Sequence, residues 1–321
     1  MRYLLVVLIL IVVAYSCTEQ YDLKVKSEEP RLVVEGTVTN LDGPNYVRLT
    51  QSSSDFNIDF MIRPINDSTS FYSSDRAIPI QDAKVYITDN NTLFTDSLVP
   101  CSAGKWIIHF VDTINNRVYK EFRIPTKSIS FGYYETTELK GVVGHTYSLT
   151  VKWQNKEFHA ESYMPPVPAI DSVHFNFTKG EIGKNDYNIP LIYFKEPQNE
   201  RNYYLFITSS NSSVWPYSIL SDEYLKSYVN GLDVCKGVSP DYWRTAYPDL
   251  SDGKLSWDYS IEMHSLTKEA YDYYNALIQQ FKSDGGAYSP SPASPPTNLD
   301  NGALGFFRAS AVNRVVFKRD N

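Results

Sequence analysis

The chain has 321 residues, with 30 Lys and Arg against 37 Asp and Glu, and a formal net charge of −7. Hydrophobic residues make up 42% and charged residues 21%, which excludes an intrinsically disordered or fibrous protein. Proteins that follow the nucleic-acid backbone are normally basic, so this acidic balance argues against a nucleic-acid partner. The 25 Tyr, 18 Pro and 15 Gly favour strands and turns.

Residues 1–16 are typical of a secretory signal peptide, because a positive start is followed by ten apolar residues, Leu4 to Val13. Ten helical residues reach about 15 Å, half of a hydrocarbon core of about 30 Å, so this run is too short to span a membrane. Small residues precede Cys17, and this order resembles a bacterial lipobox. We expect cleavage before Cys17 and attachment of diacylglycerol to its thiol. An added N-acyl chain would complete a stable anchor. A plain secreted chain with a free terminal thiol is the alternative.

Residues 17–29 are predicted to be a tether between the lipid and the fold. They contain several acidic residues and little periodicity. Acidic residues soon after a lipidated Cys also resemble the surface-export signal of Bacteroidetes lipoproteins, and a solvated linker is the alternative. After Cys17 only Cys101 and Cys235 remain. Export permits a disulfide between them, but two partly buried thiols are the interpretation that we favour.

Residues 30–165 are predicted to form an immunoglobulin-like β-sandwich. Leu32 to Thr39 and Tyr46 to Gln51 flank a turn with Gly and Pro, as in a hairpin. In Tyr147 to Trp153 every second residue is apolar, which indicates a strand with one buried face. About seven short strands over this length are typical of such a sandwich.

Met164 to Pro168 holds three prolines in five residues and is predicted to be a stiff connector between two domains. Residues 166–321 are predicted to form a second β-rich domain. Its clearest strand has Trp257, Tyr259, Ile261 and Met263 on one face and polar residues on the other. We therefore expect a buried face and a solvent face.

One amphipathic helix is predicted near residues 267–282. Thr267 can cap it, and Ser283 to Gly286 can end it. The apolar positions form a single stripe that must pack against a sheet or a neighbour: Ala270, Tyr273, Tyr274, Leu277, Ile278 and Phe281. The chain as a whole is thus expected to be mainly β, with one packed helix.

Several clusters along the chain resemble the DUF4249 family of Bacteroidetes outer-membrane lipoproteins, a family without an assigned function. The resembling segments run from the lipobox to the C-terminus and include Pro30 to Gly36, Gly144 to Leu149, Met164 to Ser172, Ser265 to Tyr271, Pro296 to Asn298 and Gly302 to Phe307. The resemblance implies an outer-membrane lipoprotein, often encoded beside TonB-dependent receptors. It implies no catalytic residues.

Signatures of enzymes and cofactor sites are missing from the sequence. There is no Gly-x-Ser-x-Gly elbow, His-Glu-x-x-His helix, Gly-x-Gly-x-x-Gly turn or phosphate loop. The five histidines form no His-x-His or i, i+4 pair, so strand-surface histidines are a better interpretation than a metal site. We expect no catalytic residues, no cofactor and no metal. Many carboxylates are present, but none is marked as a glycosidase pair, so a surface hydrolase is the least favoured function.

The segment from Trp215 to Tyr259 is unusually aromatic, since nine of its 45 residues are Tyr or Trp, against 30 of 321 in the whole chain. Such amphipathic rings suit a binding surface, although they can also simply cover a loop and its sheet. Within the segment we predict a binding role for Trp215, Tyr217, Tyr242, Trp243 and Arg244. Trp, Tyr and Arg are the usual anchors of interfaces.

The favoured function is a non-enzymatic accessory or substrate-capture subunit of a TonB-dependent uptake system, at the outer membrane and facing the cell surface. A TonB-dependent receptor is the expected partner, and the membrane is reached through the lipid on Cys17. A structural or adhesive surface lipoprotein is the alternative. The ligand is not indicated by the sequence.

Overall fold

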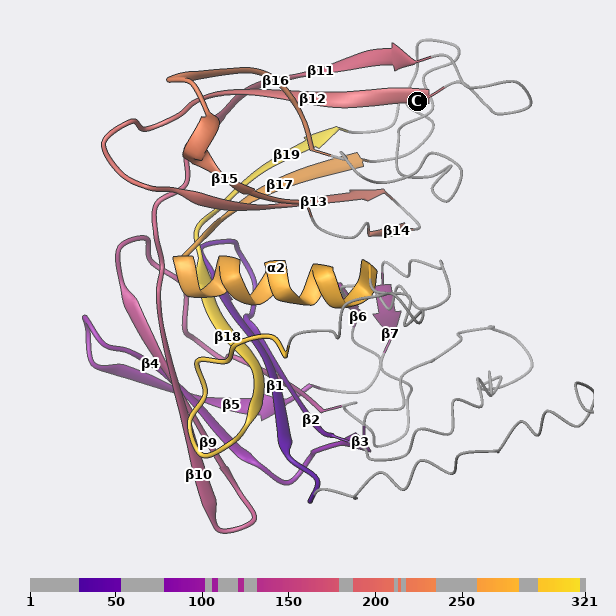
Figure 1. The fold of residues 1–321 in the computed structure, drawn as a ribbon. Coiled ribbons are helices and arrows are strands. Elements are labelled where there is room, and N and C mark those ends of the chain that lie inside the picture. Colours follow the sequence, from indigo (N-terminus) through magenta and orange to yellow (C-terminus); the bar gives the residue numbers. More distant parts are fainter. Residues whose placement is uncertain are drawn as a thin grey trace, which may run out of the picture.

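The computed structural model describes residues 29–52, 78–101, 106–108, 121–123, 132–178, 187–210, 213–214, 218–234, 259–282 and 294–317. These residues form a mainly β protein with several sheets and one α-helix (Figure 1). Among them, no helix is long and apolar enough to cross a membrane.

The largest sheet contains nine of the described strands, which follow the order β10-β9-β4-β5-β8-β2-β1-β18, with β3 beside β2. They are β1 (Leu32–Thr39), β2 (Tyr46–Gln51), β3 (Ile78–Pro79), β4 (Lys84–Asp89), β5 (Phe94–Pro100), β8 (Tyr133–Glu135), β9 (Thr146–Trp153), β10 (Lys156–Tyr163) and β18 (Leu304–Ser310). The predicted strands at Leu32–Thr39 and Tyr46–Gln51 are confirmed at these bounds.

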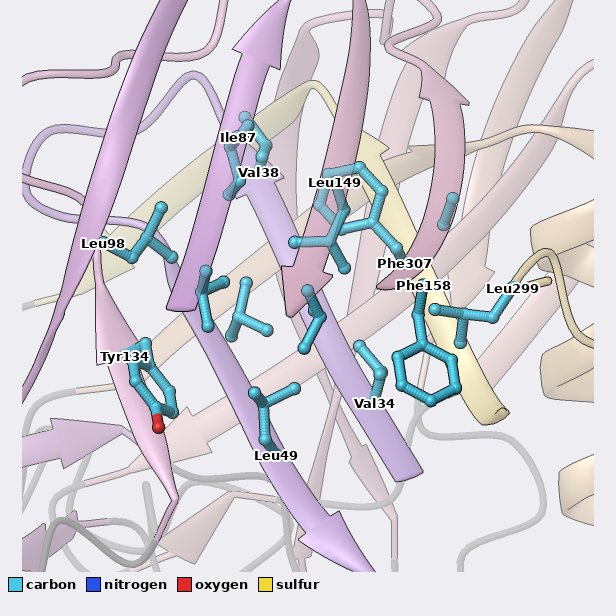
Figure 2. Close-up of a cluster of buried hydrophobic side chains, with 14 of the residues drawn as sticks. Val34, Val38, Leu49, Ile87, Leu98, Tyr134, Leu149, Phe158, Leu299 and Phe307 are labelled. Carbon is cyan, nitrogen blue, oxygen red and sulfur yellow. The ribbon is translucent and has the colours of Figure 1, made fainter. Parts of the chain in front are cut away.

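The two halves of this sheet pack face to face, as a sandwich does. Their shared core draws side chains from both halves, among them Val34 and Leu49 from one and Ile87, Leu149 and Phe158 from the other (Figure 2). All five are at most 4% exposed. The sandwich that the strand pattern predicts is therefore present.

Strand β18 comes from the far end of the chain. It pairs in parallel with β1, and Phe307 (0% exposed) fills the core of the first sandwich. Glycine makes this pairing possible, because a Cβ on Gly36 would lie 2.8 Å from the Phe307 ring and one on Gly305 would lie 2.0 Å from the Val34 oxygen. The sequence-based boundary near residue 165 does not account for β18, since parallel pairing of distant segments leaves no local signal.

Side chains close the gap between β18 and β10, the two ends of the strand order. Asn298 Nδ2 donates to the oxygens of Glu161 (3.0 Å) and Phe307 (2.7 Å), and Asn298 Oδ1 accepts from the Phe307 N–H (3.0 Å). The Ala309 N–H donates to Ser162 Oγ at 2.9 Å. These bonds satisfy backbone groups that an open sheet edge would leave unpaired.

Two further sheets pack against each other in the second half of the chain, and a short hairpin forms a separate two-stranded sheet. The three-stranded sheet is β11 (Ile170–Thr178), β12 (Tyr187–Lys195) and β16 (Tyr228–Asp233); the five-stranded sheet is β13 (Tyr203–Ser210), β14 (Ser213–Val214), β15 (Ser218–Ser221), β17 (Tyr259–Leu266) and β19 (Val312–Phe317); the hairpin is β6 (Trp106–Ile108) and β7 (Glu121–Arg123). Phe194, Phe206 and Tyr259 belong to the core between the two sheets.

The helix α2 (Lys268–Lys282) lies between the five-stranded sheet and β18 (Figure 1). The predicted cap is present, because Thr267 Oγ1 accepts from the Ala270 N–H at 3.2 Å. Ala270 is buried, and the Tyr273 ring stacks on Phe306 with centroids 5.0 Å apart. The first part of the apolar stripe thus packs on the five-stranded sheet and on β18.

Because α2 and β18 cover the second face of β17, the expected solvent face of that strand is not exposed. His264 is 3% exposed, and the side chain of Glu262, on the same face, is 14% exposed. The prediction of a surface histidine is wrong at position 264. The alternating pattern shows that the two faces differ in polarity, but not that another element covers the polar one.

The nine-stranded sandwich and the pair of sheets in the second half of the chain are the two bodies of the protein. Backbone and side-chain hydrogen bonds join them near Ala311, where β18 continues into β19. Ser265 Oγ donates to the carbonyl oxygen of Pro165 at 2.6 Å and accepts from the Ala311 N–H at 3.0 Å. The Ser265 N–H in turn donates to the carbonyl oxygen of Ala311 at 2.9 Å. The Val312 N–H donates to Asn40 Oδ1 at 2.7 Å. The two halves of the chain are therefore linked by these hydrogen bonds as well as by the connector at residues 164–168.

Candidate functional site

All of the predicted lipidation and binding residues lie outside the described residues. These are Cys17, Trp215, Tyr217, Tyr242, Trp243 and Arg244. Their predicted roles stay predictions. Cys235 also lies outside, whereas Cys101 is buried at the end of β5.

The described part of the aromatic segment contains Tyr224, Tyr228 and Tyr259, and these three tyrosines differ sharply. Tyr259 is 1% exposed and belongs to the core between the two sheets. Tyr224 is 89% exposed and Tyr228 is 48% exposed. The structural interpretation of the aromatic segment therefore holds for Tyr259, whereas Tyr224 and Tyr228 present their rings to solvent.

Tyr224 and Tyr228 lie on residues 218–228, which we call the tyrosine segment. It consists of β15, the single-turn 3₁₀ helix η1 (Asp222–Tyr224) and the start of β16. Strand β15 pairs with β13, and Leu220 and Leu225 pack against the core between the two sheets. The two leucines thus pack the segment onto the core, whereas the two tyrosines face solvent.

The buried side chain of Glu196 supports this segment from the interior of the protein. The Glu196 side chain is 2% exposed, and the Tyr204 hydroxyl donates to both of its oxygens, at 2.8 and 2.9 Å. The Asn202 amide donates to Glu196 Oε1 at 3.1 Å. We call Glu196, Asn202, Tyr204 and Asp222 the Glu196 network.

The network is bonded to both ends of the exposed turn. At one end, the Asn202 N–H donates to Asp222 Oδ2 (2.8 Å), and the Asp222 N–H donates to the Asn202 oxygen (3.1 Å). At the other end, the Glu196 N–H donates to the Ser227 oxygen at 3.0 Å. Arg201 adds an ion-pair contact to Asp222 at 3.4 Å. The turn that carries Tyr224 is therefore fixed at Asp222 and at Ser227.

Burial raises the pKa of the Glu196 carboxyl, and the hydrogen bonds from Tyr204 and Asn202 offset this effect only in part. Burial and the nearby Glu196 carboxylate also raise the pKa of Tyr204. Both Glu196 oxygens accept bonds from the protein itself. This arrangement suits a support for the tyrosine segment better than an acid or base acting on a substrate.

Nothing in the sequence marked Glu196, because a single glutamate between Lys195 and Pro197 has no periodic or motif signal. The described residues include no group of three or more His, Cys, Asp or Glu placed to hold a metal ion. One polar pair next to a described loop is His145 and Asp89, whose Nδ1 and Oδ2 lie 2.9 Å apart. The Asp89 carboxylate also accepts from Asn91 N–H at 2.9 Å, as in an ordinary turn.

The model of the family described as "Domain of unknown function (DUF4249)" matches residues 18–315. The match covers nearly the whole chain, and the chain belongs to this family. No curated protein matches it. The Asn298 closure and the glycines at Gly36 and Gly305 give a structural reason for three of the segments that carry the family resemblance.

Proposed function

We propose that this DUF4249 protein is a non-enzymatic accessory or capture subunit of a TonB-dependent uptake system, anchored in the outer membrane by lipid on Cys17. The tyrosine segment and the neighbouring residues Trp215, Tyr217, Tyr242, Trp243 and Arg244 would form its contact surface. A TonB-dependent receptor is the proposed partner.

The observation that carries the proposal is the exposure of Tyr224 on a turn that the Glu196 network holds in place. An exposed tyrosine contributes nothing to the core, whereas a pre-positioned ring offers contact area at little cost in conformational entropy. The turn lies within the part of the sequence from Trp215 to Tyr259 that is unusually rich in Tyr and Trp. These features are those of an interface anchor.

A lipid anchor on Cys17 would keep the contact surface near a transporter in the same membrane. Thirteen residues separate Cys17 from Arg31, and an extended chain of that length reaches at most about 45 Å. The folded part would then remain close to the membrane that holds a transporter. Mass spectrometry of the mature N-terminus should show diacylated Cys17, and an unmodified peptide beginning at Cys17 would contradict the anchor.

Affinity purification of the tagged full chain from the native outer membrane tests the proposed partner. We expect a TonB-dependent receptor to co-purify with the wild type, and the double variant Tyr224→Ala, Tyr228→Ala to recover at least tenfold less of it. Losses of about 2 kcal/mol are typical when an interface anchor is removed, and about 1.4 kcal/mol is a factor of ten.

Tyr163→Ala is the matched control, because Tyr163 is 44% exposed on β10 of the first sandwich, away from the tyrosine segment. It should recover as much receptor as the wild type. Equal recovery with the double variant and the control, in proteins of unchanged melting temperature, would show that the tyrosine segment is not the contact surface.

A further inference from the structure

Arg308 lies at the junction of the two bodies with its side chain almost completely buried. It belongs to β18, and β18 contacts both α2 and β17 there. Only 3% of Arg308 is exposed, and its guanidinium carbon lies 5.7 Å from the centre of the Tyr274 ring. Arginine stays protonated in proteins, so a full positive charge is buried at this position.

The hydrogen bonds of Arg308 use only one of its three nitrogens. Nη1 donates to Ser310 Oγ at 2.9 Å and lies 3.2 Å from His264 Nδ1. Nε is buried and has no hydrogen-bond partner among the described residues. The edge of the guanidinium formed by Nε–H and Nη2–H thus makes no hydrogen bond to any residue that the structure describes.

The Glu262 carboxylate, on the other side of the His264 ring from Arg308, is already bonded to other groups. Glu262 Oε1 accepts from Arg314 Nε at 2.7 Å and contacts Arg314 Nη2 at 2.6 Å, while Glu262 Oε2 lies 2.8 Å from His264 Nε2. On the neighbouring strand β1, Glu35 is within 3.7 Å of Arg48. No ion pair joins Arg308 to a described carboxylate.

His264 does not supply the missing negative charge and does not add a positive one. Its Nδ1 faces an N–H of Arg308 and must accept, so its proton is on Nε2, toward Glu262. Burial and the Arg308 charge lower the pKa of His264, which keeps the ring neutral. The group of Glu262, His264, Arg308 and Arg314, which we call the Arg308 cluster, therefore has one excess positive charge.

We propose that the Nε/Nη2 edge of Arg308 binds an oxyanion, a carboxylate or a phosphate group of a small molecule. Two parallel N–H groups on one edge of a guanidinium match two oxygens of such a group. Burying an arginine without a counter-charge is expensive, and a bound oxyanion supplies that charge. The Tyr274 ring covers one face of the guanidinium.

Thermal unfolding of the full mature chain in sodium phosphate, sodium acetate and sodium chloride at equal ionic strength tests this site. We expect a saturable rise in melting temperature with phosphate or acetate, and none with chloride. Saturation with phosphate alone identifies a phosphate group as the ligand, and saturation with acetate alone identifies a carboxylate.

The variant Arg308→Lys keeps the charge and removes the two-pronged edge, so the saturable rise should disappear. Arg201→Lys is the control, because Arg201 is half exposed, and should behave as the wild type does. The same saturable rise in Arg308→Lys, or its absence in the wild type with both anions, would overturn the proposal and leave a buried water as the partner of Nε.

A measurement on the wild type alone covers the case in which Arg308→Lys does not fold. Equilibrium dialysis of the wild type against radiolabelled phosphate or acetate measures the bound anion directly. We expect saturable binding of about one anion per chain that chloride at equal ionic strength does not displace. No saturable binding of either anion would contradict the proposal.

Discussion

Glu196, which is 2% exposed, and Glu262, whose side chain is 14% exposed, have opposite environments, and the difference separates two roles. Glu196 accepts from the neutral groups of Tyr204 and Asn202, and its pKa is raised. Burial also acts on Glu262, but the His264 bond and the Arg314 guanidinium outweigh it and lower the pKa of Glu262 to about 2. Glu196 holds a surface turn, whereas Glu262 lies within the joint between two bodies.

A large effect on stability is expected from removing the negative charge of Glu262 at the joint between the two bodies. Glu262→Gln leaves Arg314 without its ion-pair partner and should lower the free energy of unfolding by about 3 kcal/mol at pH 7. Urea unfolding measures this change. Glu157→Gln is the control, because Glu157 pairs with Lys152 at the surface, and should change stability by less than about 0.5 kcal/mol. Equal effects of the two variants would show that the joint does not depend on Glu262.

The two glutamates should also respond to pH in opposite directions. The folded Glu262 carboxyl releases its proton more readily than the unfolded one, so its stabilisation is present above pH 4.5 and is lost as the pH falls toward about 2. This shift corresponds to about 3 kcal/mol. The pKa of His264 is also lowered, so its contribution declines as the pH falls below 6.5.

The contribution of Glu196 to stability has the opposite pH dependence, because its raised pKa favours the protonated carboxyl in the folded state. Its contribution is fully present below pH 4.5 and is lost as the pH rises through the raised pKa. Glu196→Gln should therefore steepen the loss of stability on acidification, and Glu262→Gln should flatten it. Urea unfolding of both variants between pH 7 and pH 3 checks the signs, and parallel profiles would contradict them.

A smaller and local effect is expected from Glu196→Ala. The change leaves the Tyr204 hydroxyl and the Asn202 amide without their acceptor, which costs about 1 to 3 kcal/mol. Hydrogen exchange should accelerate in residues 218–228 more than in β9 of the first sandwich. Glu200→Ala, at an exposed position of the same loop, should leave both regions unchanged. Uniform acceleration across the chain would mean that Glu196 supports the whole fold and not the tyrosine segment.

The smallest effect on stability is expected at the exposed tyrosines. Tyr224→Ala should change the free energy of unfolding by less than about 0.5 kcal/mol, since the ring is 89% exposed. Tyr259→Ala, in the same aromatic part of the sequence, should cost about 3 to 5 kcal/mol because Tyr259 is in the core. Thermal melting compares the two directly, and similar losses would remove the distinction between structural and exposed rings.

Much of the local structure was predictable from the sequence, because it depends on neighbouring residues. The strands Leu32–Thr39 and Tyr46–Gln51 and the helix after Thr267 follow from periodicity and capping. The parallel pairing of β18 with β1 was not predictable in this way, since its partners lie far apart in the sequence.

The polar networks were also not predictable, for a different reason. Glu262 and His264 alternate with apolar residues as exposed residues do, and only the packing of α2 and β18 on β17 turns that face into an interior. Glu196 and Arg308 acquire their roles from partners on other strands. The aromatic segment was visible as composition, but composition did not distinguish Tyr224 from Tyr259.

Site-specific photo-crosslinking in intact cells tests most directly whether the tyrosine segment is the contact surface. A photoreactive phenylalanine analogue would replace Tyr224 in one protein and Tyr163 in another, both of which have exposed rings. The account predicts that position 224 crosslinks to a TonB-dependent outer-membrane receptor and that position 163 does not. Equal crosslinking at both positions, or a crosslink to the receptor from position 163 alone, would contradict it.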